Sequence, residues 1–199
     1  MSTAQGTQAP EANRAFQFYW LVTALTIEIS FSGLLSIGSR FLQGHFQSVY
    51  QVTTIMVVFN IASMSYCVTG LLVWSSVESN CPSFLLAANT LSHIFYTSFY
   101  CFMIAKTLVI SDMDPWVAYA SIAILFNRIC WAAADIALST GIWSDGGCVF
   151  VQHPVTGVAY NASDLLTDLF CTVVSIAWNW SILISDFSGM MRVIVKENS

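Results

Sequence analysis

Residues 115–139 read PWVAYASIAILFNRICWAAADIALS, and this run predicts a membrane-spanning helix. It contains only two charged side chains, Arg128 and Asp135. An α-helix of this length extends about 37 Å, which is enough to cross a hydrocarbon core about 30 Å thick. Asp114 and Pro115 suit its start, because aspartate caps helices well and proline fits the first helical position.

Outward from this run, four more apolar runs predict an all-α, polytopic transmembrane bundle with about five membrane-spanning helices. The four further predicted helices span residues 15–38, 49–74, 82–110 and 164–187. They form one transmembrane domain over residues 15–187. We expect a disordered polar tail at 1–14 and a short cytoplasmic tail at 188–199. The longest connection is 140–163, in which Val149–Val151 is expected to form a strand or hairpin.

The composition excludes several classes of protein. The chain is 56% hydrophobic and 9% charged, against about 25% charged in a soluble domain. The net charge is −5, and six Lys and Arg residues are too few for a basic patch. Nucleic-acid binding is therefore disfavoured, and so is a polybasic lipid anchor. The lipid bilayer is the predicted partner, together with a possible membrane-protein partner or second copy of the chain.

The orientation follows from the few basic residues, because Lys and Arg near helix ends favour the cytoplasmic side. If the amino terminus is outside, Arg14 lies on the outer side. The other four basic residues near helix ends then lie in the cytoplasm: Arg40, Lys106, Arg192 and Lys196. The sequon at Asn161 then lies in the outer loop, where it predicts a glycan. We expect the protein in the plasma membrane or another membrane of the secretory pathway.

Two opposite charges lie deep in the predicted helices. Glu28 follows Phe16 by twelve residues, and Arg128 follows Trp116 by twelve residues. If the two helices start at opposite faces, each charge lies about 18 Å from its own interface, near the midplane. A charge at that depth needs a partner or water. The two residues are predicted to form part of a ligand, proton or ion site, or else a buried structural ion pair or a contact with a partner subunit.

Three acids near the outer side are further candidates for binding. Asp135 follows Arg128 by seven residues, which places both on one helix face. Asp164 and Asp168 share a face at the predicted start of the fifth helix, where Asp164 is suited to cap it. These acids either line a vestibule for a small cationic ligand or serve as caps and solvated groups. We predict no metal, no cofactor and no enzymatic activity, because neither a metal-ligand cluster nor a nucleophile with a base is evident.

The positions of two cysteines carry a resemblance to a known family. Cys81 opens the predicted third helix, and Cys148 lies in the long outer loop before the fifth. This layout resembles the first five helices of the seven-helix, rhodopsin-like receptors. The resemblance implies a disulfide between Cys81 and Cys148. The block from Gly146 to Asp168 is also similar to uncharacterised fungal membrane proteins. This similarity implies no particular activity.

The chain departs from the receptor pattern at several points. Residues 111–114 read SDMD, where the family carries an Asp-Arg-Tyr signature. The predicted fifth helix lacks the usual proline, the sixth and seventh helices are missing, and no lysine lies mid-helix to hold retinal. Three functions therefore stay open: a receptor-like or sensor-like protein that binds a ligand near Asp135, Asp164 and Asp168, a structural or accessory subunit of a membrane complex, or a small transporter or channel.

Overall fold

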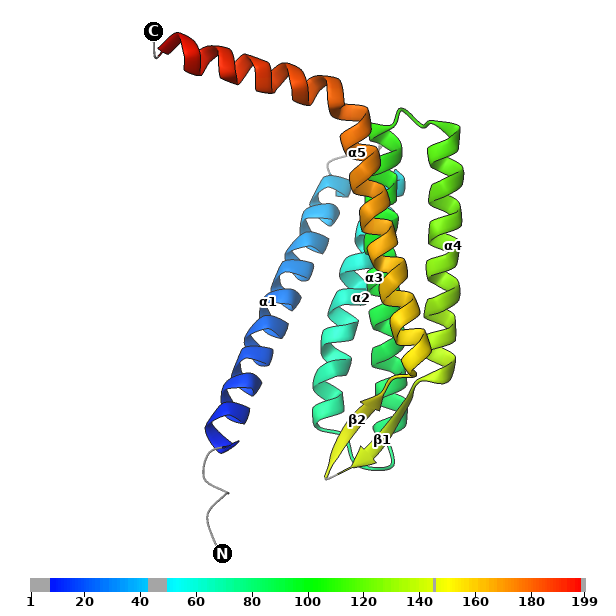
Figure 1. Ribbon diagram of the computed structural model, residues 1–199. Coiled ribbons are helices and arrows are strands. Elements are labelled where there is room, and N and C mark those ends of the chain that lie inside the picture. Colours follow the sequence, from blue (N-terminus) through cyan, green and yellow to red (C-terminus); the bar gives the residue numbers. More distant parts are fainter. Residues whose placement is uncertain (1–7, 43–49, 145, 198–199) are drawn as a thin grey trace, which may run out of the picture. The chain divides into compact units, whose positions relative to one another are not determined.

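The computed structural model describes residues 8–42, 50–144 and 146–197, and the side chains of residues 18–39, 50, 52–144 and 146–180. Within this part of the chain the fold is mostly helical, as predicted (Figure 1). The elements in chain order are α1 (Gln8–Leu42), α2 (Tyr50–Trp74), α3 (Cys81–Ile110), α4 (Pro115–Leu138), β1 (Thr140–Ser144), β2 (Gly147–Val151) and α5 (Pro154–Glu197).

Four of the helices are long and apolar enough to cross a membrane. The segments are Phe18–Ser39, Val52–Trp74, Cys81–Ile110 and Pro115–Leu138, among the described residues. Few of their large apolar side chains are buried and many are exposed, which is the pattern expected when the surrounding solvent is lipid. The chain is therefore an integral, multi-pass membrane protein.

The helix bounds differ from the predicted ones at both ends of the chain. Helix α1 begins at Gln8, so residues 8–14 of the predicted disordered tail are helical. Helix α5 begins at Pro154 rather than at residue 164, and it continues to Glu197 through most of the predicted cytoplasmic tail. The predicted tail residues 1–7 and 198–199 lie outside the described residues.

The start of α4 follows the predicted capping chemistry. The carboxylate of Asp114 accepts hydrogen bonds from the backbone N–H groups of Trp116, at 2.9 Å, and Val117, at 3.2 Å. Pro115 occupies the first turn, where its missing N–H costs nothing. This cap ends the tight turn after α3 and fixes the residue at which α4 begins.

The described chain divides into two compact units. The first contains α1, α2, the part of α3 up to Ser98 and the two strands. Its helices α1 and α2 approach closely where Ser30 and Ser63 bring their hydroxyls to 3.2 Å. One turn further on, a Cβ on Gly33 would lie 3.1 Å from Oδ1 of Asn60, so glycine makes room for that side chain. Small and hydroxyl side chains at such contacts are typical of helices that pack in membranes.

Strands β1 and β2 form an antiparallel hairpin within the first unit (Figure 1). Ile142 pairs with Val149 and Trp143 with Cys148, and Gly146 takes a positive φ of 76° in the turn. The strand expected at 149–151 is thus confirmed.

The second unit contains α3 from Phe99, α4 and α5. In contrast to the exposed apolar side chains, its fully buried side chains are mostly polar. They are Arg128, Asp135, Ser111, Ser121, Thr107, Thr156 and Thr167, together with Cys171. In lipid, polar groups gain by facing other helices, because hydrocarbon offers them no hydrogen bonds. The candidate site lies in this polar core.

Candidate functional site

The centre of the second unit is an ion pair between α4 and α5. Arg128 is fully buried, and its Nε contacts Oδ1 of Asp164, whose side chain keeps 18% of its surface exposed. The guanidinium carbon lies 5.2 Å from the ring centroid of Tyr160 and 5.9 Å from that of Tyr100. A cation beside aromatic rings is attracted to their faces, most strongly where water is excluded. Helices α3, α4 and α5 thus all contribute to holding one positive charge.

Some N–H donors of the Arg128 guanidinium are not used in hydrogen bonds within the described part of the chain. Its Nη1 and Nη2 atoms are buried and have no hydrogen-bond partner among the residues that the structure describes. Buried polar atoms usually have a partner in protein or ordered water. The two rings offset part of the cost, and the remaining donors suit a water molecule or another small acceptor.

Asp135 forms a second polar cluster two turns further along α4. Its carboxylate oxygen Oδ1 lies 2.7 Å from the hydroxyl of Thr156, 3.0 Å from that of Ser139 and 3.5 Å from Nε2 of Gln152. Asp135 itself has no exposed surface. The cluster therefore supplies donors to a buried acid, which is the condition for placing one inside a membrane protein.

The same cluster joins the end of α4 to the start of α5. The Ser139 hydroxyl donates to Asp135 and accepts the backbone N–H of His153 at 3.1 Å. Closer to the ion pair, Nδ2 of Asn127 donates to the hydroxyl of Ser163 at 2.8 Å. Helices α4 and α5 are thus linked by polar contacts at two levels, one at Asp135 and Thr156 and one at the neighbouring pairs Asn127–Ser163 and Arg128–Asp164.

The three predicted acids have different surroundings, and their role in binding a ligand stays a prediction. Asp135 is buried and engaged by its own donors, whereas Asp164 pairs with Arg128. Asp168 is exposed on α5. The capping role predicted for Asp164 is wrong, because α5 begins at Pro154 and Asp164 lies well inside the helix.

The deep charge on α1 has a different environment from Arg128. Glu28 is exposed and belongs to the first unit. The acid that the structure places against Arg128 is Asp164. A pairing of Glu28 with Arg128 stays a prediction.

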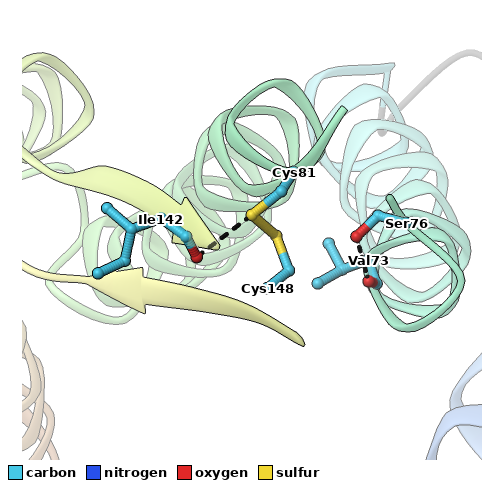
Figure 2. Close-up of a disulfide and its surroundings, with 5 residues drawn as sticks. All are labelled: Val73, Ser76, Cys81, Ile142 and Cys148. Carbon is cyan, nitrogen blue, oxygen red and sulfur yellow. Dashed lines mark hydrogen bonds between the residues drawn. A yellow bond between two sulfur atoms is a disulfide. The ribbon is translucent and has the colours of Figure 1, made fainter. Parts of the chain in front are cut away.

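The predicted disulfide between Cys81 and Cys148 is present (Figure 2). It joins the first residue of α3 to β2 with a Cα–Cα distance of 5.5 Å. The Cys81 sulfur also lies 3.3 Å from the carbonyl oxygen of Ile142, so both strands of the hairpin contact it. Just before α3, the Ser76 hydroxyl donates to the Val73 carbonyl at 2.7 Å and closes the end of α2.

The hairpin has one face toward α3 and one that is open. A Cβ on Gly141 would lie 2.7 Å from Cδ1 of Leu85, so this face of β1 packs directly on α3. Side chains alternate along a strand, and the opposite face carries three exposed apolar residues: Ile142, Val149 and Val151. The open face is thus an apolar surface presented by a covalently tethered hairpin.

Two other predicted features fall on described residues. Asn161 is exposed, but it lies in α5 rather than in a loop. Its glycosylation stays a prediction. No group of three or more His, Cys, Asp or Glu side chains that could hold a metal occurs in the described part of the chain.

Sequence reasoning did not identify Thr156 and Tyr160 as partners of the α4 charges. A signal was present, because Thr156, Tyr160, Ser163 and Thr167 recur at spacings of three or four residues. That spacing places them on one helix face. The glycines and the sequon nearby instead indicated a loop.

No protein-family model, curated protein or solved structure matches the chain. A family is therefore not assigned.

Proposed function

We propose that the chain is a receptor-like membrane protein that binds an apolar or amphipathic ligand at its hairpin. The observation that supports this function is the Cys81–Cys148 disulfide, which fixes the hairpin to the start of α3. The tether holds the exposed apolar face of Ile142, Val149 and Val151 in a defined place. A preformed surface loses little conformational entropy when a ligand binds, which favours affinity.

The proposal includes α5 as a fifth membrane span. Within its described part, the side chains of Leu165, Leu169 and Val173 are exposed and apolar, as expected for a face turned to lipid. The polar face of the same helix is turned to α4 through Thr156 and Asp164. Such a division between a lipid face and a polar interior face is typical of a helix in a membrane bundle.

The hairpin end is proposed to face the outside of the cell. A disulfide persists in oxidising compartments, and Lys106 lies toward the other end of α3, where basic residues favour the cytoplasm. The glycan at the exposed Asn161 belongs to the same proposal. We propose binding rather than catalysis.

The experiment uses the full chain in lipid nanodiscs. A panel of small apolar and amphipathic molecules is screened for saturable shifts of the thermal unfolding midpoint. Ligands that stabilise the protein are expected to lose their effect when Cys148→Ser releases the hairpin. The matched control is Cys130→Ser, which removes an exposed cysteine of α4 that forms no disulfide.

Two results would contradict the proposed function. One is that no molecule binds saturably, and the other is that binding is equally strong in Cys148→Ser. A flux assay in liposomes separates the transport alternative, since a receptor-like protein passes no solute down an imposed gradient.

A further inference from the structure

A groove lies between α3 and α5 in the second unit. It has a volume of about 300 Å³. Its lining combines apolar and polar side chains: Met103, Lys106, Thr172, Ser175, Ile176 and Asn179. Lys106, Thr172 and Ile176 are exposed, so the groove opens to the surroundings of the helices.

If the hydrocarbon core begins near Cys81 and Pro154, the groove lies at the level of the lipid headgroups. Lys106 follows Cys81 by 25 residues, and Asn179 follows Pro154 by the same number. At 1.5 Å per residue each lies about 37 Å from the hairpin end of its helix. A hydrocarbon core is about 30 Å thick. The groove therefore lies toward the ends of α3 and α5 that are far from Cys81 and Pro154, at the depth expected of a membrane surface.

The chemistry of the lining selects an anion with an apolar tail. Lys106 is one of only two cations with described side chains, and the other, Arg128, is buried against Asp164. The Thr172 and Ser175 hydroxyls are further donors on α5, one turn apart. Met103 and Ile176 supply apolar surface beside them.

We propose that this groove binds the phosphate of an anionic phospholipid, with Lys106 as its charged contact and Ile176 against an acyl chain. Asp168 lies one turn from Thr172 toward the hairpin end, and its charge opposes an anion. Lys106 is therefore expected to determine whether an anionic lipid binds at all.

The first test measures lipid preference. The protein is equilibrated with equal amounts of phosphatidylserine and phosphatidylcholine, and retained lipids are counted by native mass spectrometry. One lysine near a membrane surface contributes about 1 kcal/mol toward anionic lipid, which corresponds to a preference of about fivefold. Lys106→Gln is expected to abolish this preference, and Lys106→Arg to keep it. An unchanged preference in Lys106→Gln would overturn the proposal.

The second test locates the lipid. A photo-crosslinking residue replaces Ile176 in the groove, and in a control it replaces Ile122, an exposed residue of α4. At position 176 most adducts are expected to contain phosphatidylserine. At position 122 the fraction of adducts that contain phosphatidylserine is expected to equal its fraction in the bilayer. Equal labelling at both positions would refute a specific site. Complete competition by inorganic phosphate would mean that a free anion, rather than a lipid, occupies the groove.

Discussion

Arg128 and Asp164 form an ion pair in which the two partners are unequally buried. The arginine has no exposed surface, while the carboxylate side chain keeps 18% of its own. Removal of the carboxylate therefore leaves a charge with no access to solvent. Removal of the arginine leaves a carboxylate that keeps part of its exposure. The two single substitutions are not equivalent.

We expect Asp164→Asn to destabilise the protein by about 3–5 kcal/mol, because it leaves a buried charge without its counterion. Arg128→Met should cost less, and the double substitution Arg128→Met with Asp164→Leu should recover most of the loss. The free energy of unfolding in mixed micelles measures all three. A double variant no more stable than Asp164→Asn would show that the pair is needed for more than charge compensation.

The second prediction concerns the donors to Asp135. Thr156→Val removes the shortest of them, at 2.7 Å, and should cost about 1–3 kcal/mol, since the buried carboxylate loses a partner. Thr167→Val is the matched control, because Thr167 is equally buried on α5 but bonds the carbonyl of Ser163 in its own helix. The comparison uses the same unfolding assay. Equal effects of the two substitutions would mean that the bond to Asp135 adds nothing specific.

The transmembrane architecture was predictable because helices in lipid must be long, apolar and internally hydrogen-bonded. Helices α2, α3 and α4 begin and end within a few residues of the predicted bounds. The Asp114 cap and the strand at Val149–Val151 also follow from local chemistry, which acts through near neighbours in the chain. The disulfide was implied only by the resemblance to receptors.

The start of α5 was not predictable from composition. Thr156, Gly157 and Asn161 are typical of a loop, yet Thr156 bonds Asp135, and a Cβ on Gly157 would lie 2.8 Å from the side chain of Gln152. Their helical placement depends on tertiary contacts with α4. The partner of Arg128 was missed for a related reason. Periodicity gives the depth of a charge in the bilayer, but not which helix lies beside it.

The third prediction tests the contact between the hairpin and α3. Gly141→Ala should destabilise the protein by about 1–3 kcal/mol, because the new methyl group overlaps Leu85. The control is Gly147→Ala, whose Cβ would come no closer than 3.9 Å to the Ser144 carbonyl oxygen. In a Leu85→Gly background Gly141→Ala should be nearly neutral, whereas in a Leu85→Ala background it should keep part of its penalty, because the Cβ of residue 85 stays 2.9 Å from the new methyl group. A full penalty of Gly141→Ala in the Leu85→Gly background would place its cause in the strand backbone instead.

The last prediction decides which end of the bundle is outside. Val77 and Met113 are both exposed, and they lie in the connections at opposite ends of α3. If the amino terminus is outside, Val77→Cys reacts with a membrane-impermeant maleimide on intact cells, and Met113→Cys reacts only after the membrane is opened. Met113 already has a positive φ of 57°, so cysteine adds no new backbone strain there. The background protein with Cys130→Ser corrects for native thiols. If only Met113→Cys is labelled on intact cells, the orientation is the opposite one. That result would also contradict the proposal that the tethered hairpin meets a ligand from outside.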